Sequence, residues 1–254
     1  MANTIFDKSV IETAAKDQLI TKVNTRALMD VDTSLAEQSG MTKIINVYEY
    51  TGAAEALEEG QGNTTRGKIA PTKVEYKVKR VQANFDYSDE NFYADNAVVD
   101  IGVDGATNEL KNKMNADFAA ECAKATLSVA GGVSYETIVD AIKTLNVEDE
   151  SGIFVVTDNE GKATLRKDED YKTARMGEVV YTGQVGAVAG LPVIQMNGID
   201  GTYVMTKDAV KLLLKKDIEV GTDRDEDKCL NSVYVRAFYI CALHNATKIC
   251  KITD

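Results

Sequence analysis

The chain has 254 residues, of which 44% are hydrophobic and 27% are charged, a composition typical of a globular protein with one large domain or two small ones. Asp and Glu number 40 against 29 Lys and Arg, and this net charge of −11 argues against a nucleic-acid-binding protein, which neutralises phosphates with basic side chains. No apolar run approaches the roughly 18 residues of a membrane helix, and the N-terminus lacks the pattern of a signal peptide.

Residues 1–40 are predicted to form an N-terminal arm that depends on a partner surface. Asp7 precedes apolar residues at helical spacing, so it is expected to cap a short helix. Residues 24–40 are polar and only weakly periodic, which leaves them little apolar surface to bury on their own.

Residues 41–88 are predicted to form an extended two-stranded loop. Residues 43–50 are rich in β-formers, and residues 72–87 alternate between apolar and charged side chains. The glycine-containing connection between them is too long for a tight hairpin turn, and such connections are usually functional. Because an isolated two-stranded ribbon is marginally stable in water, we expect the loop to lie on another surface.

The charges of this loop are grouped by sign. Three acidic residues follow the first predicted strand, and basic residues dominate the segment after them. One interpretation is an ordinary solvated strand surface. The other is a set of inter-subunit contacts, in which acidic and basic patches set the orientation of an oppositely charged neighbour. The candidate contact residues are Glu55, Glu58, Glu59, Arg66, Lys68, Lys73 and Lys77.

A long helix is predicted over residues 97–127, after a short helix over 89–95 that Ser88 caps. Gly131-Gly132 is expected to end this part of the chain. The apolar residues of the long helix recur every three or four positions, at Val99, Val103, Ala106, Leu110, Met114, Phe118, Cys122 and Ala125.

The remaining elements are predicted to be shorter. Ser134 caps a helix with an apolar stripe from Tyr135 to Leu145, a turn lies at 158–161, and Thr206 caps a helix over Ala209–Leu214. Other segments have the composition of strands, and they are Ile153–Val156, Val179–Val188, Pro192–Met196, Thr202–Met205, Ile218–Gly221, Val233–Leu243 and Thr247–Ile252.

Motifs for catalysis and for cofactors are missing from the sequence. It contains no phosphate-binding loop, nucleophile elbow or H-E-x-x-H, and its single histidine disfavours a histidine-based catalytic unit. Asp223, Asp225 and Asp227 resemble the start of a calcium loop, but Lys228 and Tyr234 replace its required glycine and glutamate. The four cysteines form no C-x-x-C pair and are expected to be reduced. We predict no enzyme activity, no metal and no cofactor.

The order of the predicted elements resembles that of the major capsid proteins of tailed bacteriophages, which have the Hong Kong 97-type fold. The most specific local similarity is the glycine-spaced segment Tyr181–Val193, which ends in Gly190-Leu-Pro192-Val193. The segment Asp217–Asp225 and the strand that follows it at Tyr234–Leu243 are also similar. The resemblance extends over nearly the whole chain.

The resemblance implies an α+β fold with five regions. These are the N-terminal arm (1–40), the extended loop (41–88), a peripheral domain with a spine helix (89–133), an axial domain (134–217) and return strands of the peripheral domain (218–254). Some family members carry an additional N-terminal scaffolding segment. We expect none in a chain of this length, so assembly would use a separate scaffolding protein or none.

The resemblance also implies a function. The chain would self-assemble through hexamers and pentamers into an icosahedral shell, with a portal protein as a further partner. The shell would enclose double-stranded DNA without sequence-specific binding and without a membrane. The protein would be found in the virion capsid, and in the host bacterial cytoplasm during assembly. A negative inner surface would leave the DNA free to move.

Three alternatives stay open at the level of sequence. A phage tail-tube or other structural protein would form tubes or rings and would not need the helix at 97–127. An encapsulin-like nanocompartment shell would need a cargo-binding pocket. An enzyme of unrecognised type would need a deep pocket with clustered ionisable groups.

Overall fold

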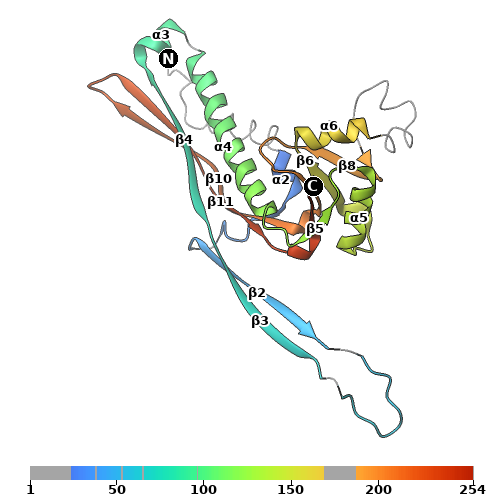
Figure 1. Ribbon diagram of the computed structural model, residues 1–254. Coiled ribbons are helices and arrows are strands. Elements are labelled where there is room, and N and C mark those ends of the chain that lie inside the picture. Colours follow the sequence, from blue (N-terminus) through green and yellow to red (C-terminus); the bar gives the residue numbers. More distant parts are fainter. Residues whose placement is uncertain are drawn as a thin grey trace.

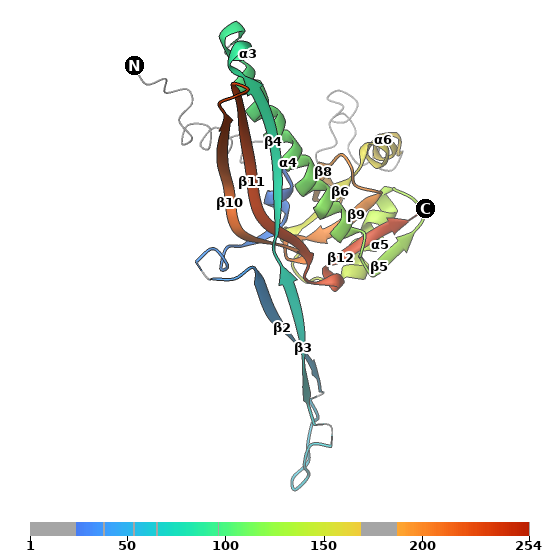
Figure 2. The same ribbon diagram turned by 90° about the vertical axis from the view of Figure 1, so that its left-hand side faces the viewer.

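The computed structural model describes residues 24–37, 39–52, 54–64, 66–95, 97–168 and 187–253. Its described strands form three sheets of four, six and two strands. Figures 1 and 2 show an elongated body built from the two larger sheets, from which the two-stranded sheet projects as a long ribbon. The predicted helix after Asp7 and the segment Tyr181–Gly186 lie outside the described residues.

The four-stranded sheet forms the elongated part of the body. Its long strands run antiparallel to their neighbours, and the short β1 pairs in parallel with β10 at the opposite side from β4. The strands, in spatial order, are β1 (Asp30–Asp32), β10 (Val210–Asp225), β11 (Leu230–Leu243) and β4 (Lys79–Ser88). Alternate residues such as Ala83, Val233 and Val235 are buried, so one face of this sheet belongs to the main core.

One long helix, α4 (Val98–Cys122), covers that face (Figure 2). The predicted apolar stripe from Val99 to Cys122 is buried throughout, which confirms the spacing argument. The short helix α3 (Asp89–Ala94) precedes it, and the Ser88 hydroxyl accepts a hydrogen bond from the Asn91 amide, as predicted for a cap.

The end of the long helix was predicted too late in the chain. The helix stops at Cys122, and the following residues turn into strand β5 (Leu127–Ala130), which pairs in parallel with the C-terminal strand β12 (Ile249–Thr253). The Ala125 side chain still packs against the main core from the turn. Leu127 and Val129 pack instead against the second hydrophobic cluster, which explains why apolar residues continue past the helix.

The six-stranded sheet lies beside the C-terminal end of α4 (Figure 1). Its described strands, in spatial order, are β5, β12, β9 (Thr202–Thr206), β6 (Ile153–Thr157), β8 (Leu191–Gln195) and β7 (Ala187–Val188). One face packs against α5 (Tyr135–Leu145) and α6 (Asn159–Lys167), and the other joins the main core. Strand β6 is buried on both faces because Val155 belongs to the second cluster and Phe154 to the main core.

Two predicted local structures are wrong. The predicted turn at 158–161 is the start of α6, where an Asp158 carboxylate oxygen accepts a hydrogen bond from the Gly161 amide at 2.7 Å. The predicted helix at Ala209–Leu214 is part of β10, preceded by a short 3-10 turn at Lys207–Ala209. Leu212 and Leu213 are both fully buried, since the two faces of this strand contact different clusters, and an apolar run of this kind does not distinguish a strand from a helix.

The projecting ribbon consists of β2 (Thr42–Thr51) and β3 (Lys68–Lys77), paired along their whole length. The range 41–88, predicted as one loop, divides at Val78, whose amide donates to the Met41 carbonyl oxygen at 2.8 Å. Beyond Val78 the chain continues as β4, which leaves the ribbon to pair with β11. The predicted single strand over 72–87 is therefore two strands in two different sheets.

Candidate self-assembly surface

The tip loop, which we define as the connection between Thr51 and Lys68, has a fixed internal contact. The Glu55 carboxylate accepts hydrogen bonds from the Thr64 amide at 2.9 Å and from the Thr64 hydroxyl at 2.8 Å. The two arms of the loop are thereby held together. Glu58, Glu59 and Leu57 are exposed, so the free end of the ribbon presents two carboxylates and an apolar side chain to solvent.

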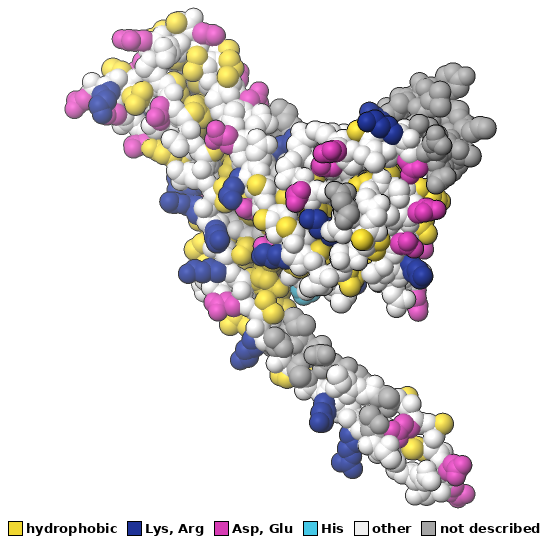
Figure 3. Space-filling view, viewed as in Figure 1, with side chains coloured by type: hydrophobic (Ala, Val, Ile, Leu, Met, Phe, Trp, Pro, Cys, Tyr) yellow, Lys and Arg dark blue, Asp and Glu magenta, His cyan; other side chains and the backbone are white. Residues whose placement is uncertain are grey.

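The four basic candidates follow the ribbon from its tip towards the body. Arg66, Lys68, Lys73 and Lys77 are all exposed. Lys73 and Lys77 alternate along β3 with Val74 and Tyr76, whose side chains lie on the opposite face of the strand. Figure 3 shows acidic side chains at the free end and mostly basic ones nearer the body, where the exposed Glu75 lies between Lys73 and Lys77.

Six of the candidates are exposed, and they are Glu58, Glu59, Arg66, Lys68, Lys73 and Lys77. None of these six has an ion-pair partner within the part of the chain that the structure describes. Glu55 differs from the other six, because its carboxylate is used inside the tip loop. The structure therefore assigns Glu55 to the shape of the loop and leaves the other six facing solvent. That these residues contact another subunit remains a prediction.

The ribbon also exposes apolar side chains that the sequence reasoning missed. Ile69 is 66% exposed and Ile44 is 61% exposed, and both lie on the face of the ribbon that carries Lys73 and Lys77. The alternation of apolar and charged residues in β3 indicated that one face of this strand is buried. The sequence could not show that Ile44 of β2 pairs opposite Glu75, which places Ile44 on the exposed face. Large apolar side chains on an exposed ribbon are typical of a surface that is covered on association.

The root of the ribbon is attached to the body by a small cluster and an ion pair. Tyr76 packs with the buried Leu213 and Ala242 of the four-stranded sheet. Lys43, at the start of β2, donates hydrogen bonds to the carboxylate of Asp32 and to the hydroxyl of Ser34. These contacts fix the direction in which the ribbon leaves the body.

This ion pair gives the attachment of the ribbon a pH dependence. Burial alone would raise the pKa of Asp32, but hydrogen bonds from Lys43 and Ser34 outweigh it and lower the pKa to about 2. A folded-state pKa below the ordinary 3.8 means that the carboxylate contributes stability above about pH 4, and that this contribution disappears as the pH falls towards 2.

We expect Asp32→Asn to reduce the acid sensitivity of the chain. As the pH falls from about 5 to about 2, the free energy of unfolding of the wild-type protein should decrease by roughly 2 kcal/mol more than that of the variant. Urea unfolding at several pH values measures this difference. Asp140→Asn, at an exposed carboxylate with no side-chain partner among the described residues, is the matched control. An equal acid response in wild type and Asp32→Asn would contradict the assignment.

The acidic tip gives a second prediction, on assembly. Glu58→Lys combined with Glu59→Lys should impair assembly more strongly at low salt than at high salt, because exposed charges are screened beyond a Debye length of about 10 Å at 0.1 M. Light scattering at two ionic strengths measures the effect. Glu58→Gln with Glu59→Gln is the control for the loss of charge alone. A defect that is independent of salt would argue against electrostatic orientation.

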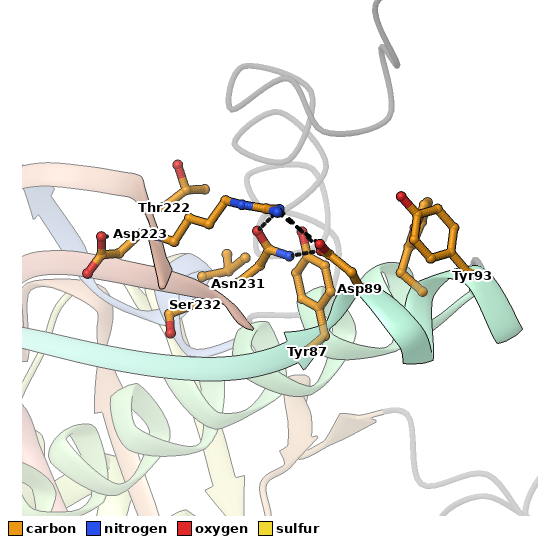
Figure 4. Close-up of a pocket in the computed structure, with 10 residues that line it drawn as sticks. Tyr87, Asp89, Tyr93, Thr222, Asp223, Asn231 and Ser232 are labelled. Atoms are coloured by element: carbon orange, nitrogen blue, oxygen red, sulfur yellow. Dashed lines mark hydrogen bonds and ion pairs between the residues drawn. The ribbon is translucent and has the colours of Figure 1, made fainter. Parts of the chain in front are cut away.

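A concave site of about 550 Å³ lies at the opposite end of the body, between α3 and the β10–β11 hairpin (Figure 4). The Arg224 guanidinium donates to both carboxylate oxygens of Asp89, at 2.9 and 3.2 Å, and also to the Asn231 side-chain oxygen. The Asn231 amide donates to Asp89 at 2.7 Å. These groups satisfy one another, and the network ties the hairpin to the start of α3.

The charges at this concave site support a structural role. Hydrogen bonds from Arg224 and then Asn231 lower the pKa of Asp89, so its carboxylate is stabilised as the anion and is not poised for proton transfer. Asp225, considered above for calcium, pairs with Lys228 at 2.9 Å. Among the residues that the structure describes, no three His, Cys, Asp or Glu side chains are grouped to hold a metal ion.

The remaining candidates for chemistry are the four cysteines and the single histidine. Cys122, Cys241 and Cys250 are buried free thiols, and Cys229 is exposed. Burial raises the pKa of Cys122 to about 12, so this thiol is protonated at neutral pH. Burial, followed by the nearby Lys211, lowers the pKa of His244. No helix in the described ranges combines the length and the apolar character needed to cross a membrane.

Comparison with known proteins places this architecture. No protein-family model matches the chain. The sequence is 25% identical over 246 residues to the major capsid protein of Staphylococcus phage phiMR11, which covers 93% of this chain and 89% of that protein. The structure is similar to the capsid of Cyanophage P-SCSP1u, with a TM-score of 0.71, 12% identity and coverage of 89% of this chain and 86% of the other.

A similarly complete match is the virus-like particle from Pyrococcus furiosus, with a TM-score of 0.67, 11% identity and coverage of 96% and 98% of the two chains. At these identities the structural matches define the fold. The predicted α+β fold of the Hong Kong 97 type is thereby confirmed, and it extends over nearly the whole chain.

Proposed function

We propose that the chain is the major capsid protein of a tailed bacteriophage, which self-assembles into the icosahedral shell around the genome. The observation that carries the proposal is the ribbon, whose strands and tip project away from both cores of the body (Figure 1). Its exposed Ile44, Leu57 and Ile69 have no apolar cover in the described part of the chain. A two-stranded ribbon is marginal alone, so a neighbouring copy is the surface that stabilises it.

The sequence relationship supports the same function. The phage relative is a major capsid protein, and the similarity covers 93% of this chain and 89% of that protein. A tail-tube protein is not favoured, because the structural matches include a phage capsid and a virus-like particle. An enzyme is not favoured either, because the charged side chains at the concave site, Arg224 and Asp89, are paired with one another.

The regions of the chain follow the sheets in this proposal. The four-stranded sheet with α4 is the peripheral domain with its spine helix, and the six-stranded sheet with α5 and α6 is the axial domain. Compared with the boundaries predicted from sequence, β4 moves from the extended loop to the peripheral domain. Strands β5 and β12 move to the axial domain, because they pair within its sheet.

The partners follow from the same proposal. Copies of the chain form hexamers and pentamers, a portal protein occupies one vertex, and a separate scaffolding protein assists where one is used. Assembly takes place in the host bacterial cytoplasm, and the finished shell belongs to the virion. The net charge of −11 suits a shell that encloses double-stranded DNA without gripping it. The proposal assigns the chain no catalytic activity and no cofactor.

Electron microscopy of the purified protein tests the proposal. We expect closed icosahedral particles, and DNA inside those isolated from infected cells. Open tubes or rings would favour a tail protein. Closed particles that contain a protein cargo and no DNA would favour an encapsulin-like nanocompartment. A monomer with no particles under any assembly condition would contradict a shell function altogether.

A further inference from the structure

Strand β4 is the last strand of the four-stranded sheet, and β11 is its only strand neighbour among the described residues. Figure 2 shows β4 at the border of the sheet, with β11 and β10 on one side of it and α4 behind. The other edge of this ten-residue strand is therefore unpaired within the described part of the chain, and such an edge is a template for pairing with another strand. No proline or bulge interrupts the pairing of β4 with β11.

A groove runs beside this edge. It has a volume of about 400 Å³ and is lined by four consecutive residues of β4, Arg80 to Ala83, and by Glu109, Leu110 and Lys113 of α4. The helix therefore forms a floor that extends past the edge of the sheet. A strand added to β4 would lie over this floor, with main-chain hydrogen bonds on one side and side chains below.

The side chains along the outer face of β4 have unused bonding capacity. Arg80, Gln82, Asn84 and Asp86 alternate on that face, and all four are exposed. None of them has a hydrogen-bond or ion-pair partner in the described part of the chain. Their order along the strand is cation, amide, amide, anion.

When two copies of β4 run antiparallel, this order of side chains places the cation of each copy opposite the anion of the other. If β4 pairs antiparallel with β4 of a second copy around Ala83, Arg80 lies opposite Asp86 of the other copy and Gln82 lies opposite Asn84. Val81 then lies opposite Phe85 on the helix side, and Ala83 lies opposite itself. Shifting the register by one residue would put outer-face side chains opposite helix-face side chains, so it is not compatible with one continuous sheet.

Helix α4 contacts both β4 and β11, and Figure 2 shows it running past the free edge of β4.

A glycine of α4 lies near the axis of this arrangement. Gly102 abuts the Phe85 ring, and α4 runs antiparallel to β4. Gly105, less than one turn further on, therefore lies close to the level of Ala83. No atom lies within 4 Å of the position that a Cβ of Gly105 would occupy, so the helix surface is open at this point.

We infer that two copies of the chain join edge to edge through β4, around a two-fold axis at Ala83, into one continuous sheet of eight strands. The occupant of the edge is thus a second copy of the same strand. The inference rests on the proposed function, because a closed shell supplies two-fold contacts between copies. Main-chain hydrogen bonds hold the edge, and the two Arg80–Asp86 pairs set its register.

Disulfide trapping tests the pairing in the assembled particle. In a Cys229→Ser background, which removes the exposed native thiol, Gln82→Cys combined with Asn84→Cys puts the new thiols on directly opposite positions. The Cα atoms at such positions are about 4.5 to 5.5 Å apart, which suits a disulfide. Each single variant leaves its thiols diagonal, about 7 to 8 Å apart, and serves as the matched control.

We expect the double variant to give covalent dimers at least about ten times more efficiently than either single variant, on non-reducing gels of oxidised particles. Normal particles without covalent dimers would overturn the edge pairing and leave the shell function standing. Equal yields from single and double variants, or a cross-link to a chain of different mass, would also overturn it. If the wild-type chain forms no particle under any assembly condition, the proposed function fails, and trapping in concentrated free protein still decides the edge pairing.

A charge exchange gives an independent test of the register. Arg80→Glu and Asp86→Arg should each lower particle yield by about tenfold, since each places like charges opposite one another twice. The combined variant Arg80→Glu with Asp86→Arg should recover the yield, because the pairs are re-formed with reversed sign. The two residues lie too far apart along one strand to compensate within a single chain. No recovery in the combined variant would overturn the proposed register.

Discussion

Replacing the tip loop between Thr51 and Lys68 by Asn-Gly should give a chain that folds and forms no closed shells. Thr51 and Lys68 are directly paired, so a two-residue turn can connect β2 to β3 without disturbing the ribbon. Those of the removed residues that the structure describes belong to no hydrophobic cluster of the body. We therefore expect the free energy of unfolding to change by less than about 1 kcal/mol, because removing an exposed loop mainly shortens the chain to be ordered.

Urea unfolding together with electron microscopy measures both parts of this expectation. A second variant keeps the length of the loop and changes Leu57, Glu58 and Glu59 to Ser, which separates the reach of the loop from its side-chain contacts. If the short-loop chain assembles into normal shells, the tip loop is not an assembly contact. If it fails to fold, the loop contributes to the body in a way that its exposure does not indicate.

Phe118→Ala should have the opposite pattern, with a large loss of stability and no change in the shape of the shells that still form. The Phe118 side chain is fully buried in the main core. Truncating a buried phenylalanine removes its transfer free energy and leaves a cavity, at a cost of about 3 to 5 kcal/mol. Fewer molecules would then be folded and available for assembly.

Chemical denaturation at several urea concentrations measures this loss. Val139→Ala on α5 is the matched control, since that side chain is 42% exposed and its truncation should cost less than about 1 kcal/mol. A cost below about 1 kcal/mol for Phe118→Ala would contradict its place in the core. Particles of altered geometry would show that α4 also determines the contacts between subunits. Together with the loop variant, this experiment separates folding from assembly.

Parts of the fold with a clear period could be predicted from the sequence. The stripe from Val99 to Cys122 follows a helical period, and the structure buries it along one side of α4. Ser88 and Ser134 were identified as caps, and both accept hydrogen bonds from amides in the first turn of their helices. These features depend on residues close together in the chain, which a sequence displays directly.

Features set by distant partners could not be predicted in the same way. The segment at Ala209–Leu214 has apolar residues at spacings that suit a helix or a strand buried on both faces, and pairing with β1 and β11 makes it a strand. The division of 41–88 at Val78 depends on β11, which comes more than a hundred residues later in the chain. The spacing of residues in 41–88 does not indicate that β11 is the partner of β4.

The candidate site was predicted in part. All seven charged candidates lie on the ribbon or its tip, but the sequence could not show that Glu55 is used internally by Thr64. It also could not show that Ile44 and Ile69 are exposed, since their burial depends on the register of β2 against β3. The free edge of β4 became visible only with the strand order of its sheet. Contact with a neighbouring copy remains the prediction to be tested.

The most direct test of the assembly account is a three-dimensional reconstruction of the assembled particle by electron cryomicroscopy. We expect the tip loop, including Leu57 and the exposed Glu58 and Glu59, to lie against the body of a neighbouring subunit, with Ile44 and Ile69 covered. A ribbon folded back onto its own subunit, or one that projects into solvent with these side chains uncovered, would contradict it.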